Sequence, residues 1–428
     1  MSRNSFMNAR PSPICLSKFG STKSARVAVH TVMRIATLIA IATTTLSPAS
    51  AAPYVGAGTC AGFPRLDLQV PDGWCVGLVA DAASGLRFPR RLLEVSPGRF
   101  WLVDMGGWDA GRGRLLEFSL PANGAAQPAA MTLLADKLDR PFGIALGPDG
   151  KVYVGEAGRI WRTSPFGPFN AETVIDGLPT DGAHPLKEIV FGDGGRLFVN
   201  MGSSTDACRD SAGRQPLPCA DASGARPRAA VYEAVLGGPE FTLRSFEPFA
   251  TGLRNSAALA WVAASGTLLQ GENSIDYSDG ASPPEELNLL RKGADYGWPY
   301  CVGARQPARG YEGRADCARS TPPAMLWPAH AAPLQMLAVP TTAKNAFAGQ
   351  LMVAWHGYRA GGHRVVSFAL DGAGRPSGAP RSWISGWGAA RGVRPLGTPA
   401  GILVDSFGRL LVVEDRNRTV LMLTREAP

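Results

Sequence analysis

Short apolar runs alternate with glycine-containing turns along this chain, in one arrangement that recurs six times. In each copy an apolar segment is followed by a turn that contains glycine, and then by a second segment rich in β-branched or aromatic residues. The turn and the returning segment occupy residues 96–104, 147–156, 192–200, 263–272, 347–355 and 405–415. The apolar segments ahead of the turns begin at Arg90, Phe142, Leu186, Ala257, Pro333 and Ala400. Because glycine supplies the positive φ that tight hairpins often need, each copy predicts a β-hairpin.

Six consecutive hairpins predict an all-β fold, a six-bladed β-propeller with four-stranded antiparallel blades. The key glycines of successive turns lie 45 to 83 residues apart, which matches one blade plus insertions of variable length. We expect residues 52–428 to form this single domain. The two longest insertions, residues 203–228 and 273–325, are rich in Gly, Pro and Asp and are predicted to be surface loops.

The first 51 residues differ in composition from the rest. They hold six Lys or Arg side chains, no Asp or Glu, and an apolar stretch centred on residues 35–41 that is followed by Ala49-Ser50-Ala51. This order is typical of a signal peptide, so we expect cleavage after Ala51 and a periplasmic or secreted protein. If translation started at Met33 instead of Met1, the basic residue Arg34 would still precede the apolar stretch. The stretch is shorter than the ~20 residues that cross a bilayer, so the protein is predicted not to span a membrane.

The predicted leader also carries most of the formal net charge of +8. Without its six basic residues, the remaining Lys and Arg nearly balance the 35 Asp and Glu. The sequence has no basic cluster interleaved with aromatic residues, so we do not expect nucleic acid as a partner.

Six of the seven cysteines follow the leader and fall into three close pairs, Cys60 with Cys75, Cys208 with Cys219, and Cys301 with Cys317. Six cysteines allow 15 connectivities, of which local pairing is the simplest. An even number in an exported chain favours disulfides over free thiols. There is no C-x-x-C-H motif, so covalent haem is not expected.

Polar residues recur where each predicted hairpin begins and ends. These two positions lie at the same edge of a blade, which in a propeller faces one mouth of the central channel. The beginnings include His184, Arg254, Asn255 and His330, and the ends include Glu156, Asn200, Glu272, His356 and Asp415. Such a rim suits oxidation, hydrolysis or metal-assisted chemistry. Any single histidine among them could equally be a surface or strand-capping residue.

Carboxylates gather in the second long insertion, where Asp276 and Asp279 precede Glu285 and Glu286. Hard oxygen ligands of this kind suit Ca²⁺. The Glu pair could also be a solvated helical turn, and no EF-hand spacing is present.

At these positions the chain resembles the glucose/sorbosone dehydrogenase family, soluble six-bladed propellers that carry pyrroloquinoline quinone (PQQ). The most specific segments are GLRNSAALAW (residues 252–261) and EELNLLRKGADYGWPYC (residues 285–301). Residues 330–336, 353–365 and 397–415 are closer to the sorbosone-type branch. The resemblance covers most of the chain after the leader, from about residue 71 to residue 425.

The resemblance implies that a base takes the sugar hydroxyl proton while hydride passes to the quinone, and that Ca²⁺ polarises the quinone. By position, His184 matches the base, and Arg254 with Asn255 matches a pair that contacts the cofactor. The calcium ligands would be backbone carbonyls of Gly271, Glu272 and Asn273, with Asp276 as a possible side-chain ligand. Arg359 lies near a lysine that binds the cofactor in the family, and His330 and His356 are further candidate contacts.

Three positions depart from the glucose-oxidising branch, in which an Asp precedes the base, a Gln begins the second blade and two arginines begin the last. Here these places hold Ala183, Arg140-Pro141 and Thr398-Pro399. The cofactor carboxylates would therefore need other partners, for which Arg90, Arg140 and Arg394 are candidates.

The sequence leaves three functions open. The first is an exported dehydrogenase that uses PQQ and Ca²⁺ to oxidise a sugar or related alcohol and passes electrons to a separate acceptor, a quinone or a cytochrome. The second is a Ca²⁺-dependent lactonase with Glu156 and Asn200 as metal ligands. The third is a non-catalytic propeller that binds carbohydrate or protein. Fold alone does not separate them.

Overall fold

The fold is described from a computed structural model, in which residues 55–122, 129–388 and 396–426 are placed. These residues are almost entirely strands and turns, with the 3₁₀ helices η1 (Ala82–Ser84), η2 (Asp193–Gly195) and η3 (Cys317–Arg319). The predicted leader, residues 1–51, lies outside them. The predicted all-β class is confirmed.

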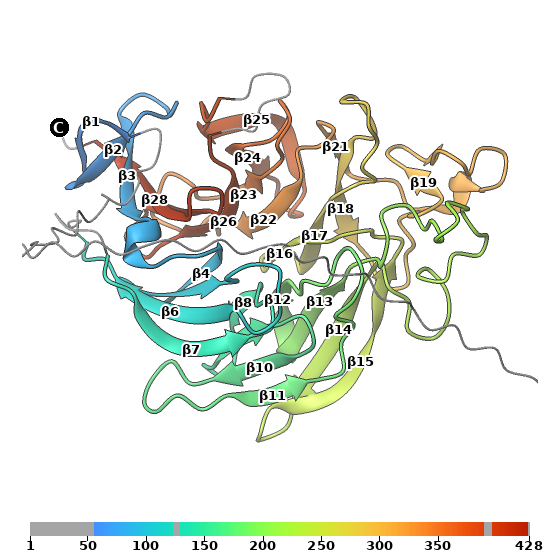
Figure 1. The fold of residues 1–428 in the computed structure, drawn as a ribbon, viewed down its shortest axis with the longest axis horizontal. Coiled ribbons are helices and arrows are strands. Elements are labelled where there is room, and N and C mark those ends of the chain that lie inside the picture. Colours follow the sequence, from blue (N-terminus) through green and yellow to red (C-terminus); the bar gives the residue numbers. More distant parts are fainter. Residues whose placement is uncertain (1–54, 123–128, 389–395, 427–428) are drawn as a thin grey trace, which may run out of the picture. The chain divides into compact units, whose positions relative to one another are not determined.

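The strands form six antiparallel blades that follow one another along the chain (Figure 1). Blade 1 comprises β4 (Pro89–Ser96), β5 (Arg99–Asp104), β6 (Gly113–Ser119) and β7 (Thr132–Leu138). Blade 2 comprises β8 (Ile144–Leu146), β9 (Val152–Gly155), β10 (Ile160–Thr163) and β11 (Glu172–Ile175). Blade 3 comprises β12 (Ile189–Phe191), β13 (Arg196–Met201), β14 (Ala230–Gly237) and β15 (Thr242–Thr251).

Blade 4 comprises β16 (Ala258–Val262), β17 (Thr267–Glu272), β18 (Glu285–Leu290) and β21 (Met325–Trp327). Blade 5 comprises β22 (Pro333–Ala338), β23 (Gln350–Trp355), β24 (Arg364–Leu370) and β25 (Pro376–Ile384). Blade 6 comprises β26 (Pro399–Val404), β27 (Leu410–Glu414), β28 (Thr419–Arg425) and β3 (Trp74–Ala80). Its outer edge is extended by β2 (Phe63–Leu66) and β1 (Val55–Cys60), and a separate small hairpin joins β19 (Cys301–Val302) to β20 (Gln306–Pro307).

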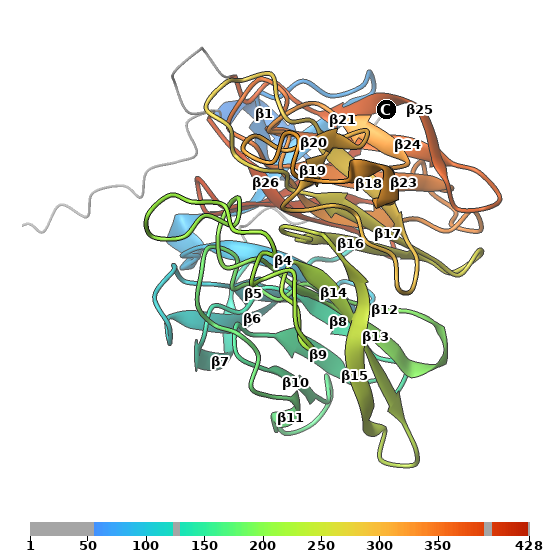
Figure 2. The same cartoon turned by 90° about the vertical axis from the view of Figure 1, so that its right-hand side faces the viewer.

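All six predicted hairpins are present as the first two strands of the six blades. The first strand of each blade contacts the first strand of the next, and β26 contacts β4. The ring is therefore closed, and the predicted six-bladed propeller is confirmed. The ten-residue β15 is the longest strand and forms the outer edge of blade 3 (Figure 2).

Blade 6 joins the two ends of the propeller sequence. Strand β3, which precedes blade 1 in the chain, pairs antiparallel with β28, so that Leu78 lies opposite Leu421 and Val76 opposite Leu423. All four side chains are buried. Pairing of a strand before blade 1 with the last strand links the ends of the ring by backbone hydrogen bonds and by apolar packing.

One arginine connects all six blades at their innermost strands. Arg91 in β4 is fully buried, and its guanidinium donates hydrogen bonds to a carboxylate oxygen of Glu188, at 2.7 Å from Nε. The same guanidinium donates to four carbonyl oxygens, those of Arg90, Ala257, Leu334 and Ala400. It also lies 4.0 Å from the ring centroid of Phe142, ahead of β8. Arg91 therefore lies where the innermost strands converge, and it donates hydrogen bonds to acceptors from blades 3 to 6.

Most of the polar residues that end the second strand of a blade bind the backbone at the start of the same blade. Side-chain oxygens of Asp104, Glu156, Asn200, Glu272 and Glu414 accept from the N–H groups of Phe88, Asp139, Glu188, Arg254 and Thr398, respectively, at 2.5 to 2.9 Å. Since an unpaired buried N–H costs about 1–3 kcal/mol, these acceptors have a structural role in each blade. In blade 5 the equivalent N–H of Ala332 donates instead to Glu285 of blade 4, at 3.1 Å.

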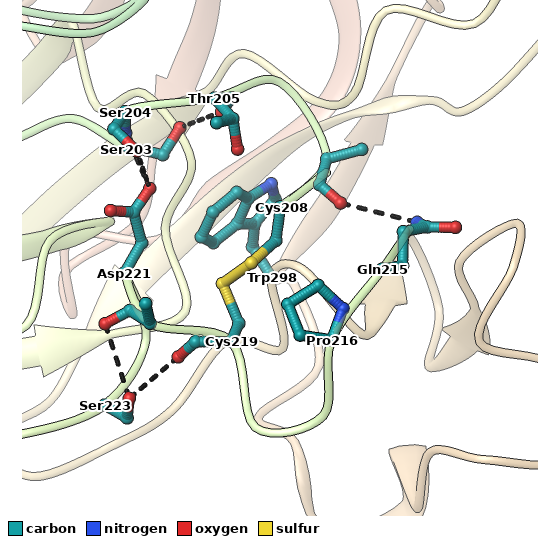
Figure 3. The surroundings of a disulfide bond; sticks show 12 residues. Ser203, Ser204, Thr205, Cys208, Gln215, Pro216, Cys219, Asp221, Ser223 and Trp298 are labelled. Atoms are coloured by element: carbon teal, nitrogen blue, oxygen red, sulfur yellow. Dashed lines mark hydrogen bonds between the residues drawn. A yellow bond between two sulfur atoms is a disulfide. The ribbon is translucent and has the colours of Figure 1, made fainter. Parts of the chain in front are cut away.

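The two long insertions pack on each other over a small core of their own. It includes Ala207 and the Cys208–Cys219 disulfide from the first insertion, and Tyr277, Trp298 and Tyr311 from the second. Trp298 lies against this disulfide (Figure 3), and its indole Nε1 donates to the carbonyl oxygen of Asp206 at 2.9 Å. The predicted surface loops therefore form a compact cap rather than separate loops.

The three local disulfides predicted from the cysteine spacing are all formed, between Cys60 and Cys75, Cys208 and Cys219, and Cys301 and Cys317. Disulfides of this kind are typical of oxidising compartments. Within the placed residues, no helix has the length and apolar character needed to cross a bilayer.

Candidate functional site

A pocket of about 500 Å³ opens at the rim between the cap and the loops of blade 5. Its size lies within the range of small-molecule sites. Eight of the residues predicted from the sequence line it: His184, Arg254, Asn255, Asn273, Asp276, His330, His356 and Arg359. The remaining walls include Tyr277, Glu285 and Tyr358.

His184 lies in the segment that leads into β12, and its Nδ1 is held by Ser203. Nδ1 is 2.9 Å from the Ser203 hydroxyl oxygen and 3.1 Å from the Ser203 carbonyl oxygen. The hydroxyl itself donates to the carbonyl of Thr205 at 2.6 Å, so both Ser203 oxygens accept from Nδ1–H. This arrangement assigns the proton to Nδ1 and leaves the Nε2 lone pair as the proton acceptor.

The protonation of His184 is set by its surroundings. Burial lowers the pKa of His184 to about 3, and the nearby positive charges of Arg254 and Arg228 contribute to the decrease. The imidazole is therefore neutral at neutral pH and available to accept a proton.

Arg254 ties the two insertions together at the floor of the pocket. Its guanidinium donates to the Asn273 carbonyl oxygen at 2.8 Å, to the Asp276 carboxylate at 2.9 Å, and to the carbonyl and carboxylate of Asp206 at 3.1 and 2.8 Å. All three nitrogens are thus engaged within the protein. Since the side chain is buried, these contacts fix its charge in place next to His184.

A second cluster of side-chain nitrogens lies where the cap meets the loop after blade 4. His330 Nε2 and Arg359 Nη1 both bind the carbonyl oxygen of Asp279, at 3.1 and 2.9 Å. His330 Nδ1 lies 3.7 Å from the carboxylate of Asp276. Asp276 therefore stands between Arg254 and His330.

His356 forms a pair with a buried carboxylate of the neighbouring blade. Its Nε2 is 3.1 Å from both oxygens of Asp415, which also accepts from Thr398 Oγ1 at 2.9 Å and from Arg90. Burial alone would raise the pKa of Asp415, but His356 and Arg90 lower it to about 2. An ionised Asp415 therefore orients His356 from across the gap between blades 5 and 6.

The residues predicted to bind calcium lie away from the pocket or are bound by other parts of the protein. Gly271 lies within β17, between its partners in β16 and β18. Glu272 does not line the 500 Å³ pocket, and burial with the neighbouring Glu286 raises its pKa to about 8. The Asn273 carbonyl and the Asp276 carboxylate both accept from Arg254. Among the placed residues no three His, Cys, Asp or Glu side chains form a group suited to a metal ion.

The remaining candidates lie apart from the pocket. Arg140 pairs with Asp139 at 2.7 Å and donates to the carbonyl of Thr180 at 3.0 Å. Arg90 is buried against Asp415. Arg394 lies outside the residues that the structure describes. Glu156 and Asn200, the metal ligands of the lactonase hypothesis, are buried and bind backbone N–H groups of their own blades.

Sequence reasoning did not identify Ser203, which orients His184, or the pairing of His356 with Asp415. Both contacts join residues from different strand ends. The spacing of the hairpin ends could have indicated the second contact, because His356 and Asp415 hold the same position in adjacent blades.

Comparison with known proteins gives one family match. Residues 169–359 match the family model described as Glucose / Sorbosone dehydrogenase, which confirms the resemblance seen in the sequence. A search of curated proteins found no match.

Solved structures share the fold at low identity. A calcium structure of a carbohydrate-active enzyme of family AA12 from Trichoderma reesei is 20% identical and covers 84% of this chain and 97% of that chain, with a TM-score of 0.66. The holo form of the pyranose dehydrogenase PQQ domain from Coprinopsis cinerea is 19% identical over 86% and 100% of the two chains, with a TM-score of 0.66. The apo form of the soluble aldose sugar dehydrogenase from Escherichia coli is 16% identical over 82% and 100%, with a TM-score of 0.56.

Proposed function

We propose, from the match of residues 169–359 to the glucose/sorbosone dehydrogenases, that this protein oxidises a sugar or a related alcohol by hydride transfer to PQQ held in the rim pocket. The family match supports a sugar oxidoreductase. The observation that carries the assignment of the site is the single pocket that joins His184, Arg254 and Asn255 with the histidines of blades 4 and 5.

The charge and the size of the pocket support PQQ as its ligand. PQQ is a planar quinone with three carboxylates, so it needs cationic and N–H donors in a flat cavity. Arg254 and Arg359 provide positive charge, and His330 and His356 provide ring nitrogens, around a volume of about 500 Å³. In the Coprinopsis cinerea relative, a PQQ domain of the same fold is described in its holo form.

The same residues do not fit Ca²⁺ as they are arranged. Calcium prefers six to eight oxygen ligands, whereas Arg254 already occupies the Asn273 carbonyl and the Asp276 carboxylate. Both groups keep further lone pairs, but a calcium ion, which the family resemblance implies, would lie next to the positive charge of Arg254. The proposed reaction therefore contains no metal-dependent step.

The mechanism places proton transfer at His184. Bound PQQ supplies the acceptor for the hydride that leaves the substrate carbon. His184 Nε2 takes the hydroxyl proton of the same substrate, because Nδ1 keeps its own proton against Ser203. Arg254 and Arg359 hold positive charge beside the pocket and stabilise negative charge that develops on a bound ligand. Carbon oxidation yields a lactone from an aldose or an aldehyde from a primary alcohol.

The protein is proposed to act outside the cytoplasm. Three disulfides support an oxidising compartment. Electrons would then pass from the pocket to a separate quinone or cytochrome acceptor.

The test is to load the purified protein with PQQ and follow dye reduction with a panel of aldoses and alcohols. We expect substrate-dependent dye reduction, and a fall of about 10²–10⁴-fold in kcat for His184→Gln at unchanged PQQ affinity. The matched control is His363→Gln, because His363 is a buried histidine of the β23–β24 loop that does not itself line the pocket and binds the Gly357 carbonyl. Failure of the wild type to bind PQQ would refute the proposed function.

A further inference from the structure

One exposed aromatic side chain lines the pocket. Twelve large hydrophobic side chains are exposed among the placed residues, and of these Tyr358 alone belongs to the pocket wall. It is 48% exposed, whereas Tyr277, the other tyrosine of the wall, is 8% exposed. Tyr358 therefore presents a large, partly apolar surface at the mouth of an otherwise polar site.

The loop that carries Tyr358 is anchored on both sides of it. The backbone N–H groups of His356 and Gly357 donate to the carbonyls of Ala332 and Ala331 at 3.0 and 2.9 Å, and Arg359 donates to the carbonyl of Asp279 at 2.9 Å. The His356 ring is in turn held by Asp415 at 3.1 Å. The residues before and after Tyr358 are thus fixed to blade 4, blade 6 and the cap.

A ring contact places the tyrosine beside His356 at the rim. The centroid of the Tyr358 ring is 5.3 Å from that of the His356 ring, with 52° between the ring planes. Because Asp415 holds His356, this contact gives the tyrosine ring a neighbour of fixed position.

We propose that Tyr358 is the platform on which the apolar face of a pyranose ring packs, and that it makes the site selective for ring sugars over open-chain alcohols. The proposal rests on the proposed function and specifies its substrate class. A pyranose has C–H groups on its ring faces and hydroxyls at its edge, so it needs an aromatic surface flanked by polar groups. Asn255, Asp276 and Arg359 supply such groups in the same pocket wall.

In this proposal the sugar and PQQ occupy different depths of the pocket. The platform is at the exposed mouth, whereas Arg254 is buried and His184 is partly buried. The sugar would therefore lie over Tyr358 with its reacting hydroxyl directed inward to His184. The role of Tyr358 is binding and positioning, not proton transfer.

The experiment compares Tyr358→Ala with Tyr358→Phe and with Trp108→Ala in the PQQ-loaded protein. Trp108 is the matched control, because it is 56% exposed on the β5–β6 loop and is absent from the pocket wall. An aromatic contact contributes about 0.5–1.5 kcal/mol, so Tyr358→Ala should raise the KM for an aldopyranose about two- to tenfold. The kcat for the aldopyranose, the KM for a short open-chain diol and the PQQ affinity should stay unchanged, and Tyr358→Phe should restore the KM.

Three results would overturn the proposal: an equal rise in KM for the pyranose and the diol, a rise of the same size in Trp108→Ala, or a loss of PQQ affinity in Tyr358→Ala. If the wild type neither binds PQQ nor reduces dye, the proposed function fails separately. Saturation-transfer NMR of glucose with the unloaded protein then decides the platform. Ring C–H signals that weaken in Tyr358→Ala and persist in Trp108→Ala support it, and unchanged signals overturn it.

Discussion

Replacing Arg91 by Met tests the central role that the structure gives to this side chain. The substitution keeps an unbranched apolar chain of similar length but removes every donor from the fully buried position. The carbonyls of Arg90, Ala257, Leu334 and Ala400 each lose a hydrogen bond. The carboxylate of Glu188 keeps only the N–H of Ile189, at 3.1 Å.

Breaking a buried ion pair by removing one partner costs about 3–5 kcal/mol, because the remaining charge is buried without compensation. With an unfolding entropy of about 2.1 cal/mol/K per residue, that loss corresponds to a decrease of about 4–6 °C in Tm for a propeller of this size. Scanning calorimetry with the disulfides intact measures it.

The double variant Arg91→Met with Glu188→Met supplies the control, because it removes both charges together. It should recover part of the lost stability, since apolar replacement of a whole buried pair is often close to neutral. A decrease in Tm below about 1 °C in Arg91→Met would refute the stabilising role given to Arg91, and so would a double variant no more stable than the single one.

Three further predictions follow from other contacts. Replacing Cys208 and Cys219 together by Ser should cost about 2–3 kcal/mol through the loss of a short loop closure, and should speed limited proteolysis within residues 203–228 without cutting the blades; equal proteolysis rates would contradict the cap. Glu272 has a pKa of about 8 in the folded protein against an ordinary value of 4.5, so its contribution to stability is complete below pH 4.5 and is lost as the pH rises through 8. When thermal unfolding is measured across this range, Tm should fall with rising pH in the wild type and fall less steeply in Glu272→Gln. Parallel Tm profiles for the two proteins would contradict the raised pKa of Glu272. Adding 1 mM Ca²⁺ to the unloaded, EDTA-treated protein should raise Tm by less than about 1 °C, because the positive charge of Arg254 lies against the Asp276 carboxylate; a larger rise would show that calcium binds despite this charge.

The hairpins and disulfides could be predicted because their signals are local. A glycine turn between two apolar runs specifies a hairpin within about 20 residues, and each cysteine pairs with the next one along the chain. The closure of the ring depended on a longer-range contact. Residues 74–80 became the outer strand of blade 6 only because β28, at the far end of the chain, offers them an edge.

The sequence predicted which residues gather at the rim, but not which contacts each of them makes. His184, Arg254, His330 and His356 meet in one pocket because the ends of the blades share an edge. The same rule also selected Glu272, whose carboxylate instead binds the N–H of Arg254 inside blade 4. Sequence alone does not distinguish these roles, because both need a polar side chain where a hairpin begins or ends.

The most direct test of the proposed reaction is a single turnover without dye. The PQQ-loaded protein is mixed anaerobically with an aldose, and the absorbance of the bound quinone is followed in the wild type and in His184→Gln. We predict stoichiometric bleaching in the wild type, and bleaching about 10²–10⁴-fold slower in His184→Gln at full PQQ occupancy. An unchanged rate in His184→Gln, or no bleaching of bound quinone by any sugar in the wild type, would contradict the account.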